Sequence, residues 1–163
     1  MKNTWSKEWP QFLPDYEPLR MIELGVFGGT YFGNQEVTGI NYHDYIPNQF
    51  FMECRPFHFQ LIEGKTYNKA INQFGVISGR GYKDWITSDW IREQDPYGWF
   101  NWYINFYYGR RSDDDKRQIG RWSSFKGRHA GTLKRTGLPS QPCHGHKTRQ
   151  NMLHWAIDSF KIQ

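Results

Sequence analysis

The pattern of apolar and polar positions predicts a series of short helices separated by glycine and proline residues. The strongest pattern lies at residues 97–108, where seven of the last ten residues are aromatic. Asp95 and Pro96 precede this segment as a capping carboxylate and a first-turn proline, and Gly109 follows it as a stop signal. Because rings fall on more than one side of the helical wheel, we expect this helix to be mostly buried.

Weaker signals predict further helices along the chain. Asp15 is placed to cap a short helix that Gly25 ends, and Ser112 is placed to cap another whose first turn holds three aspartates. The other segments are assigned from periodicity and from glycine and proline punctuation. We expect an irregular arm at residues 1–14, extended segments or one small hairpin at 34–63, helices at 66–74, 82–93, 116–125 and 148–160, and a basic loop at 126–147.

Together these elements predict one compact domain over residues 1–163, mainly α with a small extended or β portion. Aromatic residues make up 18% of the chain and about half of its 37% hydrophobic content, so the core must consist largely of rings. A central sheet is the alternative, because runs of aromatic residues occur both in strands and in buried helices.

Positive charge is concentrated in one quarter of the chain. The formal net charge is +5, but the 40 residues from Arg110 to Arg149 hold eleven Lys or Arg and three Asp, so this segment carries +8 and the rest of the chain −3. Such a patch is typical of proteins that bind phosphate backbones. The alternatives are a solvated face or a surface for an acidic protein.

The composition favours a soluble, cytoplasmic protein with no membrane span. No run approaches about 18 consecutive apolar residues, and the first nine residues lack the apolar stretch of a secretory signal. Cys54 and Cys143 are too few and too far apart for a disulfide framework. Cys143, His144 and His146 are of metal-ligand type, but no second cysteine lies at zinc-site spacing, so we expect no metal and no cofactor.

The segment 95–122 combines guanidinium and carboxylate groups. Two adjacent arginines near the end of one expected helix are followed by an acidic cluster at the start of the next. If buried, these groups would shift one another's pKa values and could create an acid or a base. The candidate catalytic residues are Asp114, Asp95 and Asp113, with helix capping as their alternative role. The candidate phosphate ligands are Arg110, Arg111, Arg117, Gln118, Arg121, Arg128 and Arg149.

A glycine-rich stretch is a candidate ligand loop. Gly25, Phe27, Gly28 and Gly29 lie where backbone amides could approach a phosphate or a flipped base. The stretch lacks the strand and helix context of a dinucleotide fingerprint and the Lys-Ser/Thr ending of a P-loop. Tight backbone packing under the aromatic core explains the glycines equally well.

Two sequence blocks resemble a family of small uncharacterised proteins from bacteria, phages, fungi and plants. The first is GVFGG at residues 25–29; the second is DPxGWFxWYxxF from Asp95, continued by GRRxxDxxRQIxRW from Gly109. The similarity covers most of residues 19–158, without the region 34–64. It implies that the glycine stretch and six further positions matter, without giving them roles: Arg110, Arg111, Asp114, Arg117, Gln118 and Arg149.

Charge and aromatic content lead to two main hypotheses. In the first, the protein acts on nucleic acid, DNA rather than RNA, as a base-repair or base-modification enzyme of glycosylase type. Trp99 and Tyr103 would stack a base, and Asp114 or Asp95 would stabilise a cation or activate water. In the second, it is a non-catalytic module that docks on nucleic acid or on an acidic partner protein. A small enzyme acting on a phosphorylated small molecule would use the same arginines.

Overall fold

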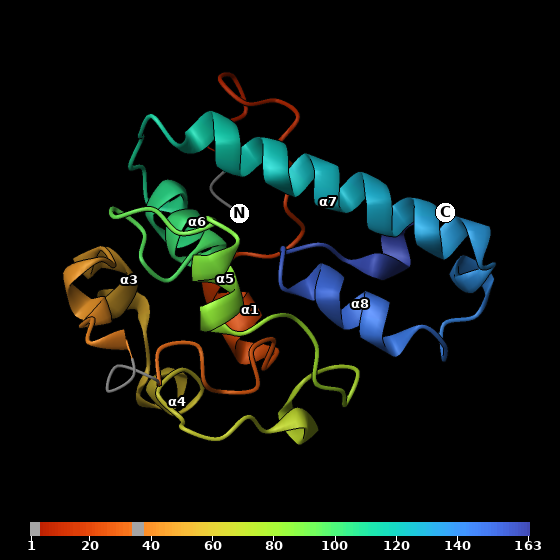
Figure 1. The fold of residues 1–163 in the computed structure, drawn as a ribbon, viewed down its shortest axis with the longest axis horizontal. Helices are drawn as coiled ribbons and strands as arrows, with labels where there is room; N and C mark the ends of the chain where they lie inside the picture. Colours follow the sequence, from red (N-terminus) through yellow and green to blue (C-terminus); the bar gives the residue numbers. More distant parts are fainter. Residues whose placement is uncertain (1–3, 34–37) are drawn as a thin grey trace.

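Helix α6 (Trp99–Tyr107) lies at the centre of the fold and is buried along almost its whole length. The computed structural model describes residues 4–33 and 38–163, and eight of the nine α6 residues are buried. Helices α1 (Pro18–Glu23) and α7 (Asp115–Arg135) both pack against it (Figure 1). The prediction of a mostly buried aromatic helix is therefore confirmed.

The described residues form seven α-helices, and their sole β-pairing is an isolated bridge between Arg92 and Asp95. The prediction of one compact, mainly helical and aromatic-rich domain is confirmed, whereas the predicted β portion is not observed in residues 4–33 and 38–163. The remaining helices are α3 (Asn48–Glu53), α4 (Pro56–Gln60), α5 (Tyr82–Thr87) and α8 (His146–Leu153), with 3-10 turns at Tyr42–Asp44, Lys69–Ile71, Leu138–Ser140 and Ser159–Lys161.

Helix α7 is the longest element and corrects the prediction of a loop at residues 126–147. It continues through the first half of that segment to Arg135. Its three glycines lower helix propensity, but a Cβ added at any of them would meet no atom within 4 Å, so they lie on an open side of the helix. The buried apolar residues of α7 are Ile119, Trp122 and Leu133. Packing of these side chains on the core therefore outweighs the weak helix propensity of the glycines.

The region 38–63 corrects the prediction of extended segments or a hairpin. Helices α3 and α4 occupy much of it. Pro47 directly precedes α3 and Pro56 begins α4, which are positions where a missing backbone N–H leaves no hydrogen bond unmade. Helices of five or six residues do not persist alone, and Phe50, which is fully buried, anchors α3 to the core. Residues 34–37 of the predicted segment lie outside the described residues.

Two aspartates that were expected to cap helices have other partners. Asp15 accepts hydrogen bonds from the backbone N–H of Asp158 at 2.8 Å and from Nζ of Lys161 at 2.7 Å, so it joins the two ends of the chain. Helix α6 begins after Gly98 and not directly after Asp95. The φ of Gly98 is +84°, a conformation that favours glycine. Both side chains therefore make tertiary contacts and do not cap the helices.

Three other predicted helices are shorter than expected. The segment 66–74 holds only a 3-10 turn, and the helix expected at 82–93 ends at Thr87, before Asp89 takes a φ of +54°. Helix α8 ends at Leu153, and the chain reverses at Ala156, which has a φ of +56°. Periodicity alone gives no signal for these left-handed residues, so it extends the helices past them.

The N-terminal arm packs two of its rings on the body of the protein. Trp5 and Phe12 are buried, and the ring centroid of Trp5 lies 5.4 Å from that of Phe106 on α6. Trp5 Nε1 also donates to the carbonyl oxygen of Phe12 at 2.9 Å, which fixes the arm's own turn. Among the described residues, no helix combines the length and the apolar composition needed to cross a bilayer.

Candidate functional site

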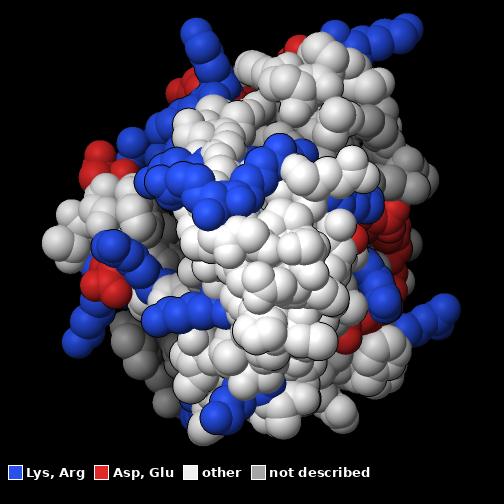
Figure 2. All heavy atoms as spheres, turned by 90° about the vertical axis from the view of Figure 1, so that its right-hand side faces the viewer, with Lys and Arg blue, Asp and Glu red and all other residues white. Residues whose placement is uncertain are grey.

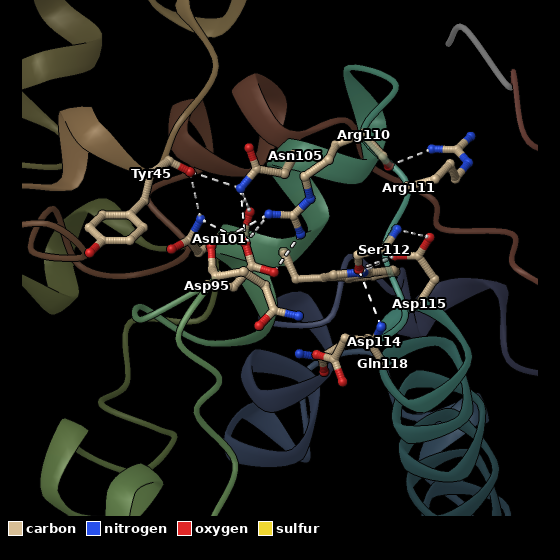
Figure 3. Close-up of polar contacts among 12 residues, drawn as sticks. Tyr45, Asp95, Asn101, Asn105, Arg110, Arg111, Ser112, Asp114, Asp115 and Gln118 are labelled. Atoms are coloured by element: carbon tan, nitrogen blue, oxygen red, sulfur yellow. Dashed lines mark hydrogen bonds and ion pairs between the residues drawn. The ribbon is translucent and has the colours of Figure 1, made fainter.

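The Asp95 carboxylate lies at the centre of a buried polar network (Figure 3). Its oxygens accept from the Arg110 guanidinium at 2.7 and 2.5 Å, and Oδ1 also accepts from Nδ2 of Asn101 and Asn105 at 3.3 and 2.9 Å. The same two amides donate to the Tyr45 carbonyl oxygen. Burial raises the pKa of Asp95, and the Arg110 guanidinium opposes this shift. The network joins the turn before α6 to the segment that follows it.

The next two candidate catalytic carboxylates lie at the start of α7. Asp113 is exposed, and its Oδ1 accepts a hydrogen bond from Nε2 of Gln94 at 3.4 Å. Asp114 is buried and holds Arg117 through two hydrogen bonds, from Nε at 2.5 Å and from Nη2 at 2.8 Å. This geometry fits an ion pair within the first turn of the helix.

Asp115 has a structural role that the sequence did not single out. It is buried and accepts from Trp102 Nε1 at 2.9 Å, from the Ser112 backbone N–H at 3.0 Å and from the Ser112 hydroxyl at 3.0 Å. It therefore fixes the start of α7 on α6 (Figure 3). The indole partner lies 13 residues away and could not be inferred from local spacing.

Two of the predicted phosphate ligands are held by contacts within the protein. Arg149 is fully buried and donates to two backbone carbonyls and to the Ser159 hydroxyl at 2.7 to 3.1 Å. Arg111 donates from Nε to Glu8 at 3.2 Å and places its guanidinium 4.0 Å from the centroid of the Phe106 ring. The Arg149 side chain has no exposed surface for a ligand in this arrangement, which corrects its predicted role.

The glycine-rich stretch is explained by packing. All three of its glycines have φ between +62° and +84°. A Cβ on Gly25 would lie 2.2 Å from the carbonyl oxygen of Ile71, and one on Gly28 would lie 2.5 Å from the ring of Tyr67. Close approach to the segment 64–71 accounts for these glycines, so the packing alternative describes them.

A large cleft lies between the segment 77–91, α7 and the residues that follow α8. Its volume is about 1170 Å³. Three arginines line it, and none of the described residues in its lining is acidic. Eleven rings line this aromatic cleft: Phe27, Tyr31, Tyr67, Tyr82, Trp85, Trp90, Tyr97, Trp99, Phe100, Phe125 and Trp155.

Guanidinium groups and rings alternate across the aromatic cleft. The Trp90 ring has the guanidinium of Arg80 at 5.7 Å and that of Arg121 at 5.4 Å from its centroid. Arg121 also lies 5.3 Å from the centroid of Trp155, which stacks on Phe125 at 4.9 Å with 21° between the ring planes. Trp90, Trp155 and Phe125 are each partly exposed. The cleft therefore presents flat apolar faces beside fixed positive charge.

Positive charge continues along α7. Arg117, Arg121, Arg128 and Arg135 fall within about 40° of one another at 100° per residue, so they form one stripe. Burial lowers the pKa of Arg121 to about 10, with Arg117 adding to the shift, and the guanidinium stays charged at neutral pH. Figure 2 shows the end of the molecule where α7 finishes: Lys and Arg cross this face, and Asp and Glu lie toward its margins.

Two histidines in the lining are neutral at physiological pH. Burial lowers the pKa of His154 to about 4 and also lowers that of His129. The His129 ring stacks on Phe125 with the centroids 3.7 Å apart. Across the described parts of the chain, no group of three or more His, Cys, Asp or Glu side chains could hold a metal ion.

The structure brings together only part of the predicted site. Arg121, Arg128, Phe27 and Trp99 line the aromatic cleft, whereas the three aspartates, the glycines and the other predicted phosphate ligands do not. Neither of the two predicted stacking residues offers an exposed ring to a base. Trp99 is only 6% exposed, and Tyr103 is fully buried with its hydroxyl on a backbone carbonyl.

Sequence reasoning missed Arg80, Trp90 and Trp155 as site residues. Trp90 lies in the helix expected at 82–93 and Trp155 in the helix expected at 148–160, and in such segments large apolar side chains are typical packing residues. They lie 65 positions apart in the sequence, and only the tertiary fold places both beside Arg121.

The fold and the site define an α-helical, aromatic-rich domain with a basic, ring-lined cleft. Comparison with models of protein families, with curated proteins and with solved structures gave no match to this chain. The function is therefore argued from the cleft itself.

Proposed function

We propose that this protein binds nucleic acid in the aromatic cleft, with the arginines on phosphates and the rings on bases. One observation carries the proposal: rings and guanidinium groups alternate across a cleft in which no described lining residue is acidic. Base stacking on aromatic side chains and phosphate binding by Arg are the two contacts that single strands use most.

Single-stranded nucleic acid suits this cleft better than a duplex. Bases in a duplex are stacked on one another and leave no face for a protein ring, whereas unpaired bases can be splayed out onto it. Trp90 and Trp155 offer such faces, and Arg80 and Arg128 are exposed on two different segments that line the cleft. DNA is the preferred partner in this proposal, and RNA is the comparison in its test.

The proposed function contains no reaction. A base-repair or base-modification activity of glycosylase type requires a carboxylate near the flipped base. Asp95 and Asp114 are each held by an arginine, and Asp113 is exposed; none of the three lines the cleft. The cleft therefore supports binding, and these carboxylates supply no catalytic step in it.

The experiment is a salt titration of binding to labelled single-stranded DNA, duplex DNA and RNA. The informative variant is Arg80→Ala with Arg128→Ala, because both side chains are exposed and their loss leaves the core intact. Arg55→Ala is the matched control, since Arg55 is exposed and does not line the cleft.

The expected result is tight binding to single strands that weakens as salt rises. Each lost phosphate contact should reduce the slope of log K against log salt by about 0.7 for a single strand, so the double variant should lose about 1.4 and the control nothing. No binding at about 50 mM salt, or equal slopes in wild type and double variant, would overturn the proposal. Equal slopes with tight binding to an acidic protein would instead favour a protein partner.

A further inference from the structure

Two side chains that line the aromatic cleft carry a buried polar atom without a partner among the described residues. Nε2 of His154 and Oγ of Ser78 are both buried and make no hydrogen bond with the described residues. Both side chains line the cleft. Buried polar atoms are nearly always paired, so two orphaned ones in one cleft indicate groups that a ligand or ordered water completes.

These two residues are brought together by a close backbone approach. A Cβ on Gly79 would lie 2.8 Å from Cε1 and 2.9 Å from Nδ1 of His154, and the φ of Gly79 is +88°. Only glycine permits this contact, and because Ser78 is the preceding residue, its backbone also lies close to the imidazole of His154. The ring of Phe27 lies 5.3 Å from the imidazole and is partly exposed, so it provides a flat face next to the two polar atoms.

The polar atoms have the chemistry of a hydrogen-bonding edge. The His154 ring already donates to the Val26 backbone, so its unpartnered Nε2 offers an acceptor, and a serine hydroxyl can donate and accept. No charged group is among the causes that shift the pKa of His154, which burial lowers to about 4, so the ring is uncharged at neutral pH. An uncharged donor and acceptor beside an aromatic face match a planar heterocycle rather than a phosphate or a carboxylate.

We infer that His154 and Ser78 form a subsite that takes one unstacked nucleobase, with Phe27 beneath it and Arg80 on the adjoining phosphate. This inference rests on the proposed function and adds base selectivity to it. Arg80 lies two residues after Ser78 and is exposed, so it can reach a phosphate outside the cleft while the base is inside. The base can belong to a polynucleotide or to a free nucleotide, and both sources share this chemistry.

The test compares labelled homopolymers of dA, dC and dT and a G-rich strand at one low salt concentration. Ser78→Ala is the informative variant, because it removes one oxygen and leaves the backbone contact intact. Ser123→Ala is its matched control, since Ser123 is exposed and does not line the cleft. His154→Gln is the second variant, and thermal unfolding establishes that each protein is folded.

We expect wild type and Ser123→Ala to prefer one homopolymer by about tenfold or more, the discrimination that a paired hydrogen-bonding edge gives. Ser78→Ala should reduce that preference to within about twofold with an unchanged salt slope, whereas the arginine double variant should weaken all strands equally. Free nucleoside monophosphates are added as competitors: displacement assigns the subsite to nucleotides in general, and displacement by oligonucleotides alone assigns it to polynucleotides.

Three outcomes overturn the inference, and they separate it from the proposed function. If all strands bind wild type equally, or if Ser78→Ala keeps the preference, then ordered water satisfies the two atoms and the subsite does not exist, while a salt-dependent affinity would leave the proposed function standing. If no strand and no nucleotide binds, both the inference and the proposed function are wrong.

Discussion

The carboxylate of Asp95 is fully buried, and the guanidinium that neutralises it, that of Arg110, is 30% exposed. The two groups share two hydrogen bonds, at 2.7 and 2.5 Å. A buried charge of this kind is tolerated only because its partner and two asparagine amides surround it. The pair therefore links the turn before α6 to the segment after it, and neither of its residues lines the aromatic cleft.

Asp95→Asn should lower the free energy of unfolding by about 3–5 kcal/mol, because the change breaks one partner of a buried ion pair. Asp89→Asn is the control, since Asp89 is 88% exposed in its pair with Arg92 and should change stability by less than about 1 kcal/mol. Urea unfolding at pH 7 measures both. Similar losses in the two variants would show that the buried pair adds nothing special.

Substitutions of Asp115 and Asp113 at the start of α7 should also differ in their effect on the free energy of unfolding. Asp115→Ala leaves the Trp102 indole N–H and the Ser112 backbone N–H without their acceptor, so we expect a loss of about 2–4 kcal/mol. Asp113→Ala should stay within about 0.5 kcal/mol, because that side chain is exposed. Thermal unfolding of the two variants side by side tests this, and a larger loss for Asp113→Ala would contradict the conclusion that Asp115 fixes the start of α7 on α6.

Comparing alanine substitutions at Gly25 and Gly75 tests whether packing explains the glycine-rich stretch. Their φ values are +63° and +65°, so an alanine at either position carries the same backbone strain of about 1–2 kcal/mol. At Gly25 the new Cβ would also lie 2.2 Å from the Ile71 carbonyl oxygen, whereas at Gly75 nothing lies within 4 Å. Gly25→Ala should therefore be clearly the less stable in urea unfolding, and equal stabilities would mean that the backbone of the segment 64–71 moves away freely.

Stability should rise with pH between about 4 and 6.5 because of His154. Its folded pKa of about 4 lies below the ordinary value of 6.5, so the unfolded chain binds the extra proton in this window and protonation favours unfolding. At 1.36 kcal/mol per unit, the contribution is about 3 kcal/mol, fully present above pH 6.5 and lost as the pH falls toward 4. His154→Gln should flatten this part of the profile, and an unchanged slope in urea unfolding would show that other groups produce it.

Local sequence signals predicted the helical class and the buried aromatic helix, because rings on every side of a helix require burial and the stop signal, Gly109, is adjacent in sequence. They failed wherever the partner is distant. Asp15 was interpreted as a cap because its partners, Asp158 and Lys161, lie more than 140 residues away. Helix α7 was truncated in prediction because its glycines face open space, which no sequence pattern indicates.

Only part of the candidate site could be predicted, again because residues distant in the sequence form it. The positive charge of the segment 110–149 was evident from the sequence. Charge alone does not distinguish the fully buried Arg149 from Arg128, which is exposed and lines the cleft. The rings that form the cleft come from segments far apart in the sequence, at residues 27–31, 67, 82–90, 97–100, 125 and 155. Their convergence depends on tertiary packing, and a single sequence carries no local signal for it.

The last prediction separates these two arginines. Arg149→Ala removes a fully buried side chain and leaves two backbone carbonyls and the Ser159 hydroxyl without their donor, so the free energy of unfolding should fall by about 3 kcal/mol or more. Arg128→Ala should stay within about 0.5 kcal/mol of wild type, because that side chain is exposed.

Binding to single-stranded DNA should show the opposite order. Folded Arg149→Ala should keep the wild-type salt slope, and Arg128→Ala should reduce that slope by about 0.7. Urea unfolding and a salt titration on the same preparations give both numbers. If Arg149→Ala instead lost affinity without losing stability, the buried guanidinium would have to reach the ligand, and the division of the arginines into internal and cleft groups would be wrong.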